Sequence, residues 1–139
     1  MLCLVEELWR EQRDAEAGAP AGFVADRSSY DYAAFWLHYG LHVGDGEGGA
    51  FRAWCRHGER YRRVILLPWG VLPLVGDGVR SIDPWTQLRF QSIVEGVLAR
   101  FAPAGQVQRI TATADLEERV RQALAGLGER AIGQDSTLE

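Results

Sequence analysis

The sequence predicts a small α+β domain in which an antiparallel β-meander packs against helices on one face. The longest apolar run, residues 61–75, lies in the middle of the chain, and segments with the apolar spacing of helices flank it on both sides. The chain has 139 residues, enough for one hydrophobic core, and no stretch reads as a linker between domains. We therefore expect a single globular domain over residues 1–139, frayed from about residue 134, with elements in the order α-α-β-β-β-α-β-α.

The first two elements are predicted to be helices. Residues 2–16 place several apolar side chains on one helical face, namely Leu4, Val5, Leu8 and Trp9. Residues 29–39 form the second predicted helix, for which Ser28 is a suitable N-cap and Asp31 can reach back to the cap. Four of its aromatic side chains share a stripe that we expect to face the core: Tyr32, Phe35, Trp36 and Tyr39.

The middle of the chain is predicted to form three strands. Residues 50–56 alternate as a strand does, and Gly58 is the expected turn residue. A second strand follows at residues 64–67. The apolar residues 71–75 return as a third strand, which Pro73 confines to a sheet edge or a bulge.

Residues 50–60 also have a helical interpretation. A helix there would place Phe51, Trp54 and Cys55 on one face, whereas a strand places Trp54 opposite to Phe51 and Cys55. The strand is our preferred prediction, and the helix stays open as the alternative.

The remaining part of the chain is predicted to be helix, strand and helix. Residues 83–102 begin with Asp-Pro, an N-cap followed by a favoured first helical residue. Residues 106–111 are compatible with a strand. Thr113 or Asp115 caps the last helix, whose core-facing stripe is Leu116, Val120, Ala123, Leu124 and Leu127.

Composition and charge restrict the class of protein. All 15 basic residues are arginine, and the net charge of −4 argues against general nucleic-acid binding, which needs a positive surface. The two cysteines, Cys3 and Cys55, form no disulfide framework, so we expect reduced thiols and a cytoplasmic location. The N-terminal segment lacks the basic start of a signal peptide, and the longest apolar run is too short to span a membrane.

No catalytic or cofactor-binding motif stands out, and we predict no catalytic residue, no metal and no cofactor. His38 and His42 are four residues apart, as metal ligands on a helix can be, but Gly40 lies between them. Cys55 with His57 is a conceivable nucleophile and base, and flanking arginines could lower the pKa of the thiol. A buried structural cysteine is the preferred interpretation.

The features that favour partner binding are arginines and tryptophans. An arginine cluster between residues 52 and 63 is interleaved with Trp54 and Tyr61, although a merely solvated face would look the same. Tryptophans in exposed turns or first helical turns are typical interface anchors. The candidate contact residues are Trp69, Trp85, Asp45, Glu47, Arg52, Arg56 and Arg60.

These observations predict a small acidic protein of bacterial type that acts by binding a partner protein. Its most concrete form is an inhibitor or immunity-type protein that neutralises a toxin or an enzyme, because an acidic surface suits a basic partner. One alternative is a small enzyme or ligand-binding domain with a pocket near Cys55, His57 and the arginine-rich segment. A secretion-chaperone-like protein is another. The oligomeric state is left open.

Overall fold

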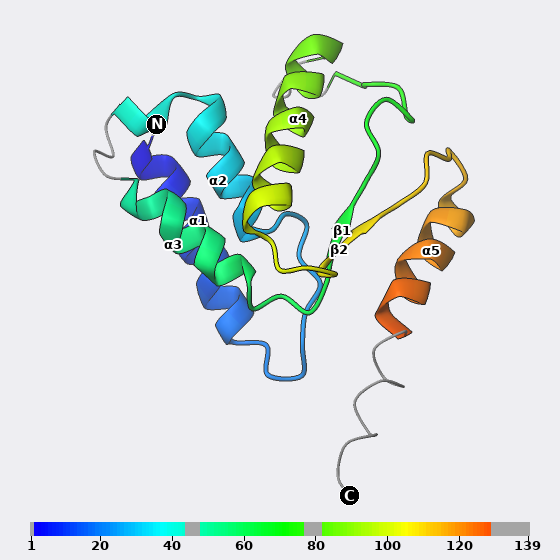
Figure 1. The fold of residues 1–139 in the computed structure, drawn as a ribbon, viewed down its shortest axis with the longest axis horizontal. Helices are drawn as coiled ribbons and strands as arrows, with labels where there is room; N and C mark the ends of the chain where they lie inside the picture. Colours follow the sequence, from blue (N-terminus) through cyan, green and yellow to red (C-terminus); the bar gives the residue numbers. More distant parts are fainter. Residues whose placement is uncertain (1, 44–47, 77–81, 129–139) are drawn as a thin grey trace, which may run out of the picture. The chain divides into compact units, whose positions relative to one another are not determined.

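A computed structural model describes residues 2–43, 48–76 and 82–128 of the chain (Figure 1). These residues form five α-helices, one short 3₁₀ helix and two strands of three residues each. The predicted α+β fold with an antiparallel meander is therefore wrong, because the described chain is mostly helical. The elements are α1 (Leu2–Ala17), α2 (Ser29–His38), η1 (Leu41–Val43), α3 (Gly49–Gly58), β1 (Val64–Leu66), α4 (Pro84–Phe101), β2 (Val107–Arg109) and α5 (Leu116–Gly128).

The chain divides into two compact units. Unit 1 contains residues 1–60 and 89–102, and unit 2 contains residues 61–88 and 103–139. The division crosses α4, so the first turn of that helix belongs to unit 2 and its remainder from residue 89 belongs to unit 1. The expectation of a single domain over residues 1–139 stays a prediction, and the tail from residue 134 lies outside the described residues.

The strand predicted over residues 50–56 is wrong, because these residues belong to helix α3. Trp54, Cys55 and Gly58 are buried on it, at positions i, i+1 and i+4, which share one helical face. A strand would instead place Trp54 and Cys55 on opposite faces of a sheet. Trp54 is 1% exposed and packs against the aromatic side of α2, so burial of this large side chain decides the conformation.

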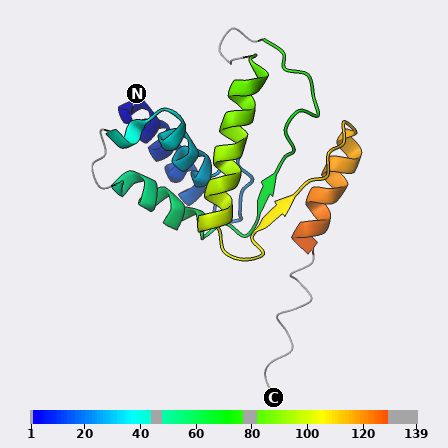
Figure 2. The same cartoon turned by 45° about the horizontal axis from the view of Figure 1, so that its top comes forward.

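Unit 1 is a helical cluster in which α2 lies beside both α1 and α3 (Figures 1 and 2). Gly58 is the last residue of α3 rather than a turn between strands, and it meets the buried ring of Tyr30 on α2. The rest of this core comes from small residues of α2 and from one face of α4. Its members include Ala33, Ala34, Val94, Val97 and Leu98.

Unit 2 contains a two-stranded parallel sheet, formed by β1 and β2 (Figure 2). Val64 is opposite Val107, and Leu66 is opposite Arg109. A meander joins antiparallel neighbours by short turns, whereas here α4 lies between the strands in sequence, as a parallel pair requires. Residues 71–75 form no strand, consistent with a proline in their middle that has no N–H to donate.

The helix starts predicted from capping residues are confirmed. The N–H of Ser28 donates to Asp31 Oδ2 over 2.7 Å, which is the reach-back bond of a capping box. Asp83 Oδ2 accepts from the N–H of Thr86 over 2.8 Å, and hydrogen bonds from Thr86 lower the pKa of Asp83. Asp115 caps α5 in the same way. Each signal is local in sequence, so it can be recognised without knowledge of the tertiary structure.

Candidate functional site

The first candidate site is a row of three arginines on α3 and just beyond it, which we call the arginine row: Arg52, Arg56 and Arg60. Arg52 and Arg56 are four residues apart on α3, so their backbone positions are separated by about 6 Å along the helix axis, and Arg60 follows two residues after the helix ends. All three are exposed, and Arg52 and Arg56 lie on the side of α3 away from the buried Trp54 and Cys55. The strand prediction places Arg52 and Arg56 along one face of a sheet, whereas the structure places them about one helical turn apart on α3.

The arginine row is electrostatically costly for an isolated chain. Like charges at i and i+4 on a helix destabilise it by roughly 0.2–0.5 kcal/mol per pair. None of the three guanidiniums has a hydrogen bond or ion pair within residues 2–43, 48–76 and 82–128. Guanidinium groups bind carboxylates in a bidentate geometry, so the row matches an acidic surface.

Two further arginines of the same sequence cluster have a structural role. In unit 2, Arg63 donates over 2.7 Å from Nη1 to the carbonyl of Gly105 and over 2.7 Å from Nη2 to that of Gly126. Arg62 Nη2 donates to the carbonyl of Leu127 over 2.9 Å. Both side chains therefore bind C-terminal carbonyls of α5, which have no partners inside their own helix. Sequence alone did not distinguish these two residues from the arginine row.

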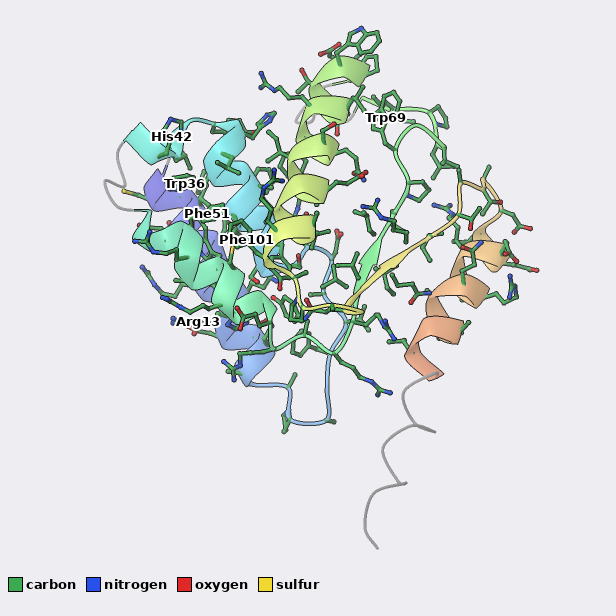
Figure 3. The ribbon with its side chains drawn as sticks, in the orientation of Figure 1. Arg13, Trp36, His42, Phe51, Trp69 and Phe101 are labelled. Atoms are coloured by element: carbon green, nitrogen blue, oxygen red, sulfur yellow. The ribbon has the colours of Figure 1, made fainter. Side chains whose placement is uncertain are left out.

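A second feature of unit 1 is a continuous series of rings, which we call the aromatic row: His42, Trp36, Phe51 and Phe101 (Figure 3). Their successive centroids are 5.5, 5.3 and 5.3 Å apart. The row includes Phe51, which precedes the first residue of the arginine row on α3. Phe101 at the other end is 40% exposed. An apolar surface thus adjoins the positive one within a single unit.

The other predicted contact residues lie in unit 2 or outside the described residues. Trp69 is 42% exposed and Trp85 is 72% exposed, and both belong to unit 2. Asp45 and Glu47 lie outside the residues that the structure describes. Trp69 and Trp85 are accessible, as an interface residue must be, and their role in binding stays a prediction.

The proposed pocket near Cys55 and His57 receives no support from the geometry. Cys55 is 5% exposed, and burial, aided by the negative charge of Glu59, raises the pKa of its thiol to about 11. The preferred interpretation of Cys55 as a buried cysteine is confirmed, whereas the alternative in which flanking arginines lower the pKa of its thiol is wrong. His57 Nε2 lies 2.7 Å from Glu16 Oε2, and its ring packs edge-on against Trp9 at 4.6 Å.

The pair of Glu16 and His57 belongs to a polar network that joins three helices. Gln12 donates to Glu16 over 2.9 Å and accepts from the hydroxyl of Tyr32 over 3.0 Å. These residues are 4 to 41 positions apart in the chain, so no sequence pattern predicted the network. It connects α1 to α2 and α3, which gives His57 a structural role in unit 1.

We expect a thiol reagent at pH 8 to modify Cys3 and leave Cys55 unmodified in the folded protein. Cys3 is exposed, whereas Cys55 is buried and, with a pKa of about 11, exists as the reactive thiolate in roughly one molecule in a thousand at this pH. Mass spectrometry after alkylation should find one label per folded chain and two in urea. A Cys3→Ser control should take up a label only in urea. Labelling of Cys55 as fast as Cys3 would contradict this assignment.

The described residues show neither a metal site nor a membrane-spanning helix. Among them, no cluster of three or more His, Cys, Asp or Glu side chains has the arrangement of a metal site. Within the same residues, no helix has the length and apolar character needed to cross a membrane. The chain matches none of the protein-family models, curated proteins or solved structures with which it was compared.

Proposed function

We propose that this protein acts by binding a partner protein, and that the arginine row forms the centre of the contact surface. The observation that supports the proposal is the exposure of Arg52 and Arg56 on α3 and of Arg60 just beyond it, without an acidic partner in the described part of the chain. The adjoining aromatic row supplies apolar contact area, and aromatic and arginine side chains are the types enriched in interfaces.

The chemistry of the row implies an acidic contact surface on the partner. Carboxylates about 6 Å apart, as on one face of a helix at i and i+4, would match the spacing of the guanidiniums. An inhibitor or immunity-type protein, which neutralises a toxin or enzyme by covering it, is the concrete form that we propose. Arg52, Arg56 and Arg60 were already candidate contacts in the sequence, but a contact centred on them calls for an acidic partner surface, whereas the acidic net charge had suggested a basic partner.

The test is capture of the partner from the cells that make this protein, followed by affinity measurement with charge-reversed variants. We expect Arg52→Glu/Arg56→Glu to weaken the captured complex at least tenfold, about 1.4 kcal/mol, because two attractive contacts become repulsive. The matched control is Arg10→Glu/Arg13→Glu on exposed positions of α1, which changes the net charge equally. Equal loss in both variants, or no loss in the first, would contradict the proposal.

A further inference from the structure

Unit 1 has a small apolar pocket between α2 and α4, which we call the Gly96 pocket. Its volume is about 220 Å³, and it is lined by Leu37, Ile93, Gly96, Val97, Arg100 and Phe101. Val97 is 2% exposed and belongs to the core, whereas Leu37 and Phe101 are 41% and 40% exposed. Pockets for small-molecule ligands usually measure about 300–1,000 Å³, so this one suits a single side chain.

Gly96 is an unexpected residue at this position. It lies inside the 18-residue helix α4, where glycine is less favourable than alanine because it loses more conformational freedom. Neither packing nor backbone requires it, since Gly96 has no positive φ and a Cβ there would meet only Arg100 Nη1, at an ordinary 3.6 Å. Its absent side chain does keep the pocket open and allows close approach of another chain.

Arg100 places a positive charge at the edge of the same pocket. Its Nη1 donates to the carbonyl of Gly96 over 3.2 Å, which holds the exposed guanidinium beside the apolar lining. No other hydrogen bond or ion pair of this side chain exists within the described residues, so most of its five donors face outward. The lining residue Phe101 also belongs to the aromatic row, which leads through Phe51 to the arginine row.

We propose that the Gly96 pocket receives one leucine or phenylalanine side chain from an acidic segment of the partner protein, and that Arg100 binds a carboxylate next to this side chain. The proposal rests on the proposed function, whose acidic partner it describes further. Charge complementarity favours this occupant, because an apolar pocket bordered by the Arg100 guanidinium matches an apolar residue with acidic neighbours.

The experiment uses acetylated tripeptide amides as probes, so it can be done before the partner is identified. Methyl NMR spectra of Leu37, Ile93 and Val97 report on occupation of the pocket during titration. We expect Glu-Phe-Glu to give saturable shifts. Glu-Ala-Glu should bind at least tenfold more weakly, because it lacks the ring whose burial stabilises the complex. Gln-Phe-Gln should also bind the wild-type protein more weakly than Glu-Phe-Glu. The Arg100→Gln variant should bind these two peptides with equal affinity.

The variants Gly96→Leu and Gly96→Ala test the pocket directly. Gly96→Leu fills it and should abolish the shifts, while Gly96→Ala shows that a side chain at this position is compatible with folding. Absent shifts in the wild-type protein, or unchanged binding to Gly96→Leu, would overturn the inference. Light scattering gives a further test. Self-association of the wild-type protein that is lost in Gly96→Leu would also overturn the inference, because the occupant of the pocket would then be a second copy of the chain.

The outcome for the pocket is separate from the outcome for the arginine row. If a partner is captured and depends on Arg52 and Arg56 but binds Gly96→Leu as it binds wild type, only the pocket inference fails. If Gly96→Leu loses the tripeptide but no captured complex depends on the arginine row, only the proposed contact surface fails. The tripeptides themselves should bind the Arg10→Glu/Arg13→Glu control as they bind wild type.

Discussion

Replacement of Gly58 by alanine is expected to lower the free energy of unfolding by about 3 kcal/mol, because the new methyl group has no space. A Cβ at Gly58 would lie 2.5 Å from Cε2 and 2.8 Å from Cε1 of Tyr30. Real Cβ atoms do not approach carbon atoms this closely, and Tyr30 is 0% exposed, so its ring cannot move into solvent. Either α3 must shift away from α2 or the ring must leave its position in the core.

Urea denaturation of the two proteins measures this effect. Gly96→Ala is the matched control, since it is the same replacement in a helix but at a position with room for the methyl group. It should raise the free energy of unfolding by roughly 0.5–1 kcal/mol, the difference in helix propensity. Opposite signs for the two variants are the expected result. Equal effects would show that propensity, rather than contact with Tyr30, determines the cost at Gly58.

Replacement of Arg63 by methionine is expected to destabilise the attachment of the α5 C-terminus within unit 2 by about 3 kcal/mol, because two charge-assisted hydrogen bonds are lost. Methionine keeps much of the side-chain length but removes the guanidinium that donates to the carbonyls of Gly105 and Gly126 over 2.7 Å each. Hydrogen bonds to a charged group contribute roughly 1.5–3 kcal/mol, and the carbonyl at the end of α5 loses its partner as well. Faster hydrogen exchange of the α5 amides, together with a lower unfolding midpoint, is the measurement.

Two comparison variants sharpen the result for Arg63. Arg63→Lys retains the charge, but one ammonium cannot reproduce the two-pronged geometry, so it should recover only part of the loss. Arg62→Met removes a single exposed bond to the carbonyl of Leu127 and should cost about 1 kcal/mol or less. If Arg62→Met were as destabilising as Arg63→Met, the double contact of Arg63 would not explain the effect.

The correctly predicted parts of the fold are those with local signals. The helices that begin near Leu2, Ser29, Pro84 and Leu116 were expected within a few residues of their observed bounds. Each has a cap or an apolar spacing that is contained in its own sequence, and a cap stabilises whichever helix follows it. The prediction of a three-strand meander was wrong because short apolar runs have no such local signal. In the structure, Trp54 of the first predicted strand is part of a helix and packs against α2.

In the candidate site, too, some features follow from the sequence and others only from the tertiary structure. The residue types of the arginine row were evident from the sequence, but their alignment depends on the helical conformation of α3. Arg56 is exposed, whereas Arg63, only seven positions later, donates to two carbonyls that the fold brings near its guanidinium. The burial of Cys55 has the same origin.

By itself the sequence determined where most helices start, and it supplied a group of arginines without lysine. Only the tertiary structure decided that residues 49–58 are helical, that β1 and β2 pair in parallel, and that Gly96 opens a pocket beside Arg100. The physical reason is the range of the interactions. Caps and helical periodicity act over about four residues, whereas burial, strand pairing and pocket formation join segments that are distant along the chain.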